Sequence, residues 1–120
     1  MIKLKRVYEP PARSDGRRFL VERLWPRGLT KEAAQLTEWL RDLAPSDRLR
    51  RWYGHDPAKW PEFKRRYRTE LRAPERQALL ARLAAAAGTG TITLVYAARD
   101  TERNSAIVVH KELEHITAAA

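Results

Sequence analysis

The chain has 120 residues, which is enough for one domain with a single hydrophobic core and too few for two. It has no cysteine, which excludes a disulfide framework, a thiolate nucleophile and a cysteine metal site, and no apolar run approaches the ~20 residues of a membrane helix. The net charge of +9 favours anionic partners. The N-terminus alternates apolar and charged residues, unlike a signal peptide, so we expect a cytoplasmic protein with no membrane partner.

The first third of the chain predicts two strands followed by a helix. Residues 2–6 alternate apolar and basic side chains, which predicts a strand that ends before the Pro10-Pro11 pair. Residues 18–24 predict a second strand, and Pro26 ends it because proline cannot donate to a central ladder. Thr30 is the expected N-cap of a helix whose apolar face has helical spacing and consists of Leu36, Trp39, Leu40 and Leu43.

The middle of the chain predicts two helices separated by a glycine. Ser46 is expected to cap a short helix that ends at Gly54. Asp56 is then placed to cap the next helix, with Pro57 at its first position. The apolar stripe of that helix predicts a buried face made of Trp60, Phe63, Tyr67 and Leu71.

The last third predicts a helix, a buried strand and a final helix. Pro74 begins the first of these, and the final helix opens at Asp100 or Thr101. Residues 91–98 are continuous, β-branched and apolar, which is typical of a strand covered on both faces. A buried strand reached after helices indicates a parallel crossover. We therefore expect one α/β domain over residues 1–120, with a small, mostly parallel sheet in three layers and helices on both faces.

Charged residues follow both inner strands of this expected sheet. Ligands of open parallel sheets bind outside the carboxyl ends of the strands, and arginine suits phosphate and carboxylate groups. With the two strands adjacent and parallel, the expected site for an anionic small molecule consists of Glu22, Arg23, Arg27, Arg99 and Asn104. Glu22 is expected to hold one arginine by a charge-assisted hydrogen bond. An ion-pair network that only ties the loops together is the alternative.

Three residues are candidates for weak catalysis at this site. His55 has a suitable intrinsic pKa for a general base and has Asp56 beside it, and Asp100 lies on the other expected wall. The same Gly-His-Asp-Pro sequence also suits an ordinary helix cap, and no nucleophile accompanies it. His110 and His115 have the wrong spacing for two metal ligands on one helix face. No metal or cofactor is expected, and catalysis stays open.

The basic segment, residues 48–72, supplies a second hypothesis. It holds nine basic residues against three acidic ones, and aromatic residues are interleaved with them. Such a face binds single-stranded nucleic acid through phosphate contacts and stacking, and its expected contacts are Arg65, Arg66 and Arg68. No known nucleic-acid motif is present. A merely solvated or partner-binding surface is the third possibility.

Three motifs occur in a fixed order: V-E-R-L-W-P-R-G from Val21 to Gly28, R-W-Y-G-H-D-P from Arg51 to Pro57, and Y-A-A-R-D followed by Asn104 and Ala106. On these residues nearly the whole chain resembles the YeaO-like branch of the domain-of-unknown-function family 488. The resemblance implies a small α/β protein and leaves its activity open. Other branches carry a Cys or His near the end of the third strand, where this chain has no Cys, so thiol chemistry is excluded. The positions that the resemblance singles out are Glu22, Arg23, Pro26, Arg27, His55, Asp56, Asp100 and Asn104.

Overall fold

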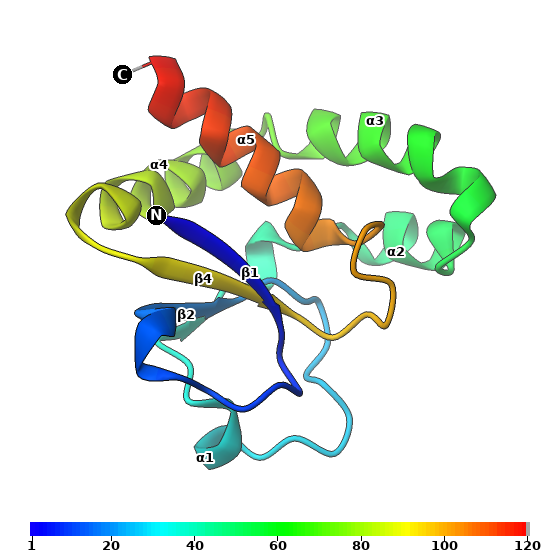
Figure 1. Cartoon of the computed structure of the whole chain (residues 1–120). Coiled ribbons are helices and arrows are strands. Elements are labelled where there is room, and N and C mark those ends of the chain that lie inside the picture. Colours follow the sequence, from blue (N-terminus) through cyan, green and yellow to red (C-terminus); the bar gives the residue numbers. More distant parts are fainter. Residues whose placement is uncertain (120) are drawn as a thin grey trace.

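A parallel β-sheet organises the chain. The computed structural model describes residues 1–119, and within them four strands form one sheet in the order β1-β4-β2-β3, with every pairing parallel (Figure 1). The strands are β1 (Ile2–Arg6), β2 (Arg17–Leu20), β3 (Glu38–Trp39) and β4 (Ile92–Tyr96). The predicted adjacency of the second strand and the strand at 92–96 is confirmed, with Phe19 opposite Leu94 and Leu20 opposite Val95.

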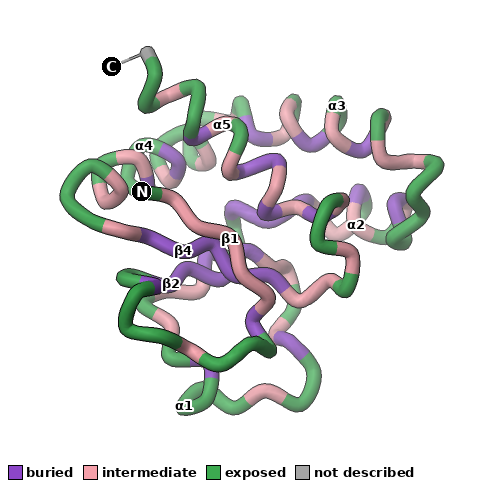
Figure 2. The backbone as a smooth tube through the Cα atoms, in the orientation of Figure 1, coloured by how far each residue is buried: buried purple, intermediate pink, exposed green. Residues whose placement is uncertain are grey.

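Four helices cover one face of the sheet. The helices are α1 (Lys31–Ala34), α2 (Asp47–Tyr53), α3 (Trp60–Glu70), α4 (Pro74–Thr89) and α5 (Ser105–Ala119), with 3₁₀ turns η1 (Arg13–Asp15), η2 (Arg41–Leu43) and η3 (Pro57–Lys59). Helices α2 to α5 lie on the same side, and their apolar residues join Phe19, Ile92 and Leu94 in the main core (Figure 1). Every residue of β4 is buried, as its continuous apolar sequence predicts (Figure 2).

The opposite face has a thinner cover. Here Val7, Leu20 and Val95 pack under Trp25 and Trp39 and their apolar neighbours, and the single turn of α1 lies beyond them. The predicted class, a small α/β protein with a parallel sheet between two layers, is confirmed. The two layers are unequal, because one contains four helices of the described chain and the other contains loops, η1 and α1 (Figure 1).

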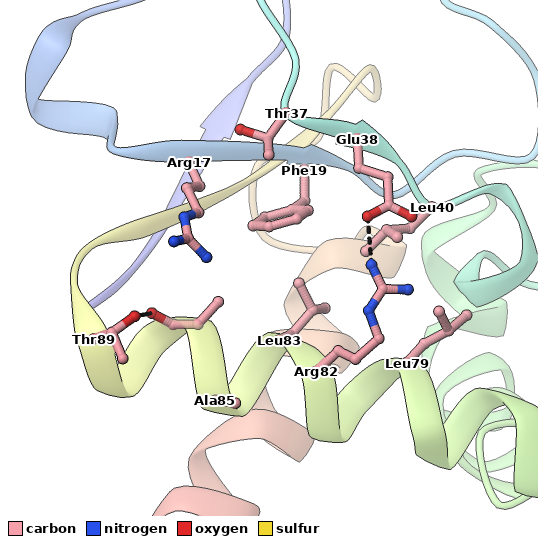
Figure 3. A pocket seen from close by; sticks show the side chains of 11 residues that line it. Arg17, Phe19, Thr37, Glu38, Leu40, Leu79, Arg82, Leu83, Ala85 and Thr89 are labelled. Atoms are coloured by element: carbon pink, nitrogen blue, oxygen red, sulfur yellow. Dashed lines mark hydrogen bonds and ion pairs between the residues drawn. The ribbon is translucent and has the colours of Figure 1, made fainter.

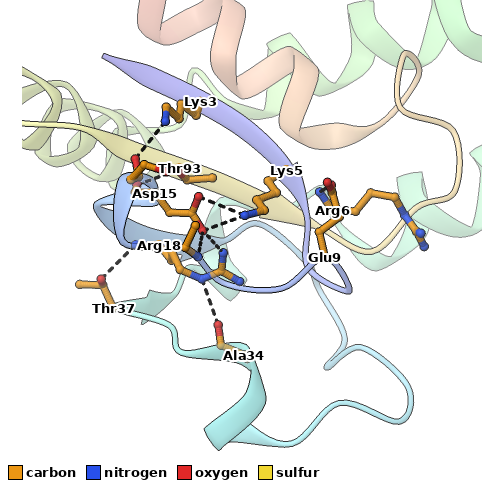
Figure 4. A network of polar contacts seen from close by, with 11 residues as sticks. Lys3, Lys5, Arg6, Glu9, Asp15, Arg18, Ala34, Thr37 and Thr93 are labelled. Carbon is orange, nitrogen blue, oxygen red and sulfur yellow. Dashed lines mark hydrogen bonds and ion pairs between the residues drawn. The ribbon is translucent and has the colours of Figure 1, made fainter.

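A buried ionic cluster completes this thinner layer (Figure 4). The carboxylate of Asp15 accepts hydrogen bonds from Arg18 at 2.6 Å and from Lys5 at 3.2 Å. Thr93 Oγ1 donates to the Asp15 carbonyl at 2.7 Å, so η1 is attached to the middle of β4. Arg18 Nε also donates to the carbonyl of Ala34 at 3.1 Å, which anchors the end of α1.

Capping residues and glycines in the sequence predicted most helix ends correctly. Ser46 and Asp56 accept hydrogen bonds from Leu49 N and Ala58 N as N-caps, and Gly54 ends α2 in the left-handed region. Phe63 and Tyr67 are buried as predicted, whereas Trp60 is half-buried at the edge of the same stripe.

The predicted helix after Thr30 is wrong beyond its first turn. Thr30 caps α1, but Gln35 adopts a left-handed backbone with φ of 45° and ends it, and residues 38–39 form β3. The apolar side chains of this segment divide between the two faces of the sheet. Leu36 and Trp39 pack on the thinner side, while Leu40 and Leu43 enter the main core. One helical stripe cannot reach both faces, so the segment is extended instead.

Two other boundaries differ from the prediction. Strand β2 ends at Leu20 rather than at residue 24, because the Glu22 carbonyl accepts a hydrogen bond from the Trp39 indole at 2.7 Å instead of a ladder amide. Helix α5 begins at Ser105 rather than at Asp100 or Thr101. Asn104 Oδ1 caps it by accepting from Ile107 N, and Asp100 caps the preceding turn. No helix within the described residues is long and apolar enough to cross a membrane.

Candidate ligand-binding cleft

A cleft of about 1000 Å³ opens at the carboxyl ends of β2 and β4. The chain leaves β2 toward α1 on the thinner side of the sheet, and it leaves β4 toward α5 on the helical side (Figure 1). Two neighbouring strands whose connections diverge in this way leave a crevice between them, which is the usual ligand position in open α/β sheets. We call this the strand-end cleft. Its walls come from residues 22–27, residues 97–105, and the end of α2.

Positive charge dominates the strand-end cleft. Within the part of the chain that the structure describes, two carboxylates, Glu22 and Asp100, line it together with five arginines, which are Arg23, Arg27, Arg50, Arg51 and Arg99. The arginines differ in how they are bound. Arg27 and Arg99 are exposed, and their guanidinium groups form no hydrogen bond or ion pair with any described residue. These two guanidinium groups are therefore open to solvent.

Arg23 has a structural role that the sequence did not indicate. Its Nε donates to the Pro45 carbonyl at 3.1 Å and its Nη2 to the Ala44 carbonyl at 3.2 Å. These bonds hold the chain just before α2 against the loop that follows β2. Arg23 thus lines the cleft, but its Nε and one of its Nη atoms already donate to backbone carbonyls, whereas the Arg27 guanidinium has no such partner among the described residues.

Glu22 does not hold an arginine, contrary to the expectation from sequence. Its Oε1 accepts a hydrogen bond from the backbone N–H of Ala97 at 2.8 Å, which joins the loops after β2 and β4. Burial raises the pKa of the Glu22 carboxyl, while the Ala97 hydrogen bond and the charge of Arg50 act in the opposite direction. Glu22 is therefore a partly desolvated carboxyl at the junction of the two loops.

Apolar and aromatic side chains form the remaining surface of the cleft, and they are Leu24, Trp25, Pro26, Pro45, Tyr53, Phe63, Ala97 and Ala98. The indole of Trp25 is held by a hydrogen bond to the Leu29 carbonyl at 2.6 Å and by edge contact with Trp39. Leu24 is 55% exposed, which is unusual for a large apolar residue in this chain. The cleft therefore combines charged groups with rigid apolar walls, as ligand sites commonly do.

The three catalytic candidates do not form an acid–base pair. His55 lines the cleft with a left-handed backbone, φ 58°, but its ring bonds to no described residue. Asp56 is absent from the described lining of the cleft, and its carboxylate caps η3 through Ala58 N at 3.0 Å. The pKa of Asp100 is lowered by backbone N–H donation from Glu102 and by Arg103, which binds it at 2.9 Å.

The buried side chain of Asn104 bonds to its own loop and to the start of α5. It is 3% exposed, and its Nδ2 donates to the Asp100 carbonyl at 2.9 Å while its Oδ1 caps α5. Both ends of the amide are therefore used locally. Among the described residues there is no group of three His, Cys, Asp or Glu side chains that could hold a metal ion.

Sequence reasoning did not assign several lining residues to the cleft, namely Trp25, Arg50, Arg51, Tyr53 and Ser105. Four of them lie inside the motifs V-E-R-L-W-P-R-G and R-W-Y-G-H-D-P or directly beside them. Their position in or beside these motifs was the only feature of the sequence that could have marked them as candidates for the cleft. It could not show that the end of α2 reaches the ends of β2 and β4.

The three arginines predicted to contact nucleic acid all lie near carboxylates of their own chain, and Arg68 lies 3.7 Å from Glu112. Arg65 and Arg66 both bind Glu62, at 2.6 and 2.9 Å. Arg66 also lies over the Trp52 ring at 4.3 Å from its centroid, and Lys59 lies over the same ring at 5.1 Å. Trp52 is therefore covered by cations of its own chain, which leaves little free aromatic face for a base to stack on.

We expect the Glu62 carboxyl to titrate at a pKa of about 2, because hydrogen bonds from Arg65 and Arg66 favour its charged form. Carbon-detected NMR titration of the side-chain carboxyl measures this value directly. In the double variant Arg65→Ala with Arg66→Ala, the pKa should rise toward that of an ordinary glutamate. An unchanged pKa in the double variant would show that the two arginines do not bind Glu62 in solution.

A second pocket of about 520 Å³ lies between α4 and the β2–β3 side of the sheet (Figure 3). Phe19, Leu79 and Leu83 supply its apolar surface, and Arg82 from α4 reaches across it to Glu38 at 2.5 Å. None of the site residues predicted from sequence lines it within the described chain. The ion pair joins the helix to the sheet, so two of the polar side chains that line this pocket are already paired with each other.

The fold and the cleft define a small α/β protein with a basic, apolar-walled crevice at a strand-end switch point. The whole chain, residues 1–120, matches the sequence model of the family DUF488-N3i, which is described as the inactive DUF488-N3 subclade, and the chain belongs to that family. The predicted resemblance to the domain-of-unknown-function family 488 is thereby confirmed.

Curated bacterial relatives share this sequence over most of its length. The chain is 40% identical over 108 residues to the "Uncharacterized protein YeaO" of Escherichia coli, covering 90% of this chain and 92% of the relative. It is also 40% identical to the "Uncharacterized protein Rv3073c" of Mycobacterium tuberculosis, covering 90% of this chain and 89% of that relative. No solved structure gives a significant match.

Proposed function

We propose that this protein binds an anionic small molecule, bearing a phosphate or carboxylate group, in the strand-end cleft. The observation that carries this proposal is the pair of exposed, unbonded guanidinium groups of Arg27 and Arg99 in a cleft of about 1000 Å³. Guanidinium is the side-chain group that best matches planar, bidentate oxyanions. The volume lies at the upper end of what small-molecule sites offer.

Binding without catalysis is the form of this function that we propose. The description of the family as an inactive subclade supports it. The positions of the candidate residues support it too, because His55 has no bonded partner among the described residues and the Asp56 carboxylate is engaged in capping η3. A general base needs an oriented partner and a nucleophile within reach.

Calorimetric titration of the protein with inorganic phosphate and with alkyl phosphates tests the proposal. Replacing Arg27 and Arg99 by alanine should weaken binding by ~1.5–3 kcal/mol per arginine, the usual worth of a hydrogen bond to a charged group. Folding should be little changed, because neither exposed guanidinium bonds to a described residue.

The matched control is the double variant Arg13→Ala with Arg72→Ala, which removes the same charge from exposed positions outside the cleft. It should bind phosphate as the parent does. A third variant, with Arg65, Arg66 and Arg68 all changed to alanine, is titrated with short single-stranded oligonucleotides at two salt concentrations. If the parent binds the oligonucleotides and only the change of Arg65, Arg66 and Arg68 abolishes that binding, the basic segment is the functional surface and the proposal for the cleft is wrong.

A further inference from the structure

Glu22 is held rigidly by contacts at both its backbone and its side chain. Its carbonyl accepts from the Trp39 indole at 2.7 Å, and its Oε1 accepts from Ala97 N at 2.8 Å. The other carboxyl oxygen, Oε2, accepts no hydrogen bond from the described residues, and it is accessible to solvent. One acceptor of a fixed, half-buried carboxyl is therefore open on the lining of the strand-end cleft.

The arginines of the cleft do not satisfy this acceptor. Arg23 is bound to two backbone carbonyls. Arg50 influences Glu22 through its charge, and its Nη2 binds Asp47 at 2.6 Å, while its buried Nε has no hydrogen-bond partner within the described chain and does not bond to Glu22. Arg51 pairs with Asp47 at 2.9 Å. Arg27 and Arg99 are exposed at the cleft surface, and no hydrogen bond or ion pair joins them to Glu22 within the described chain. Within the described chain, the cleft therefore has unpaired guanidinium groups on the exposed Arg27 and Arg99 and an unpaired carboxylate oxygen on the half-buried Glu22.

A carboxylate in a site that takes only an anion weakens binding, because like charges repel and the carboxylate remains partly desolvated and incompletely hydrogen-bonded. A ligand that also donates a hydrogen bond to this carboxylate oxygen offsets that unfavourable free energy of binding. A hydrogen bond with a carboxylate as acceptor is about twice as strong as a neutral one. A site that hydrogen-bonds a ligand N–H also discriminates strongly against analogues that lack it.

We propose that the ligand of the strand-end cleft carries, besides its anionic group, a hydrogen-bond-donating nitrogen that binds Glu22 Oε2, so that Glu22 determines specificity. This inference rests on the proposed function, because it assigns the second half of the same ligand. The nitrogen belongs either to a protonated amine or to a neutral N–H group. Both present a donor to the carboxylate, and the experiment separates them.

The test compares matched probes that differ only in the nitrogen. Ethyl, propyl and butyl phosphate are titrated against their ω-amino counterparts, 2-aminoethyl, 3-aminopropyl and 4-aminobutyl phosphate, and against the N-acetylated forms of these. The parent should prefer at least one nitrogen-bearing probe over its alkyl partner by about tenfold or more. Retention of the preference after N-acetylation identifies a neutral donor, and its loss identifies an ammonium group.

Glu22→Gln is the decisive variant, since glutamine can still accept from Ala97 N through its amide oxygen. In E22Q the preference should fall to about one, while the affinity for the plain alkyl phosphates is kept or increased. Asp100→Asn is the matched control, because it removes one negative charge from the same cleft. It should leave the preference unchanged. Thermal unfolding of each variant verifies that it is folded.

Three outcomes would overturn the inference. If alkyl and amino probes bind the parent equally, the anion site exists but Glu22 selects nothing. If E22Q keeps the preference, or if D100N removes it as E22Q does, the effect is one of general charge. If no phosphate probe binds the parent at all, the proposed function itself fails.

Discussion

Replacing Tyr67 by alanine is expected to lower the free energy of unfolding by about 3–5 kcal/mol, the usual cost of removing a large buried aromatic side chain. Tyr67 is fully buried at the centre of the contact between α3 and the main core, 5.7 Å from the Phe63 ring centroid. Its hydroxyl donates to the Leu43 carbonyl at 2.5 Å, which joins α3 to η2. Burial raises the pKa of this hydroxyl, so it stays protonated and donates.

Two further variants separate packing from hydrogen bonding. Tyr67→Phe keeps the ring and should cost only ~1–3 kcal/mol, the penalty of leaving the buried Leu43 carbonyl unpaired. Trp60→Ala should cost less than Tyr67→Ala, because Trp60 is only half-buried at the edge of the stripe. Urea denaturation followed by far-ultraviolet circular dichroism measures all three. A larger loss for Trp60→Ala than for Tyr67→Ala would contradict the packing of α3 described above.

The second large effect is expected at Asp15, where replacement by alanine should cost about 3–5 kcal/mol. Asp15 is 3% exposed, and it is the ion-pair partner of both Arg18, also 3% exposed, and Lys5. Removing its carboxylate leaves the buried guanidinium of Arg18 without a counter-charge. The loss should be larger than for removal of an exposed ion pair such as that between Asp47 and Arg51, because solvent screens the charges of that pair.

The same cluster predicts a pH dependence of stability. Burial acts to raise the pKa of Asp15, but hydrogen bonds from Ala12 N, Lys5 and Arg18 outweigh it and hold the pKa below its usual value. The contribution of Asp15 is therefore fully present above the unfolded-state pKa, ~3.9, and is lost as the pH falls through the lower folded-state value.

Urea denaturation of the parent and of Asp15→Asn between pH 7 and pH 2 measures this contribution. The difference in unfolding free energy between the two proteins should be largest near neutral pH and should shrink in acid. Glu62→Gln is the control for a strongly shifted but exposed carboxylate, and we expect its effect on stability to be much smaller. A difference between parent and D15N that does not change with pH would show that Asp15 gains nothing from its charge in the folded protein.

Much of the secondary structure could be predicted from the sequence because it depends on short-range chemistry. A side-chain cap such as Ser46 or Asp56 acts on amides two or three residues away, and Gly54 adopts the left-handed backbone that ends α2 without the clash of a β-carbon. The continuous apolar sequence of β4 predicted burial on both faces. The placement of the cleft at the ends of β2 and β4 followed from the parallel topology.

The roles of individual charged residues could not be predicted in the same way. Glu22 binds Ala97 N, 75 residues along the chain, and Arg23 binds carbonyls 21 and 22 residues away. The sequence indicated that these residues were unusual at the end of a strand. It did not contain the relative positions of the loops, so it could not distinguish a ligand-binding arginine such as we propose for Arg27 from a structural one such as Arg23.

The sequence by itself therefore determined the α/β class, the buried central strand, most helix ends and the family of this protein. Tertiary structure decided which face of the sheet each side chain of residues 36–43 packs on, and it turned a predicted helix into a short edge strand. It also decided which arginines are paired and which are free. The physical reason is the same in each case, because these outcomes depend on contacts between segments far apart in the chain, and such contacts exist only once the sheet has assembled.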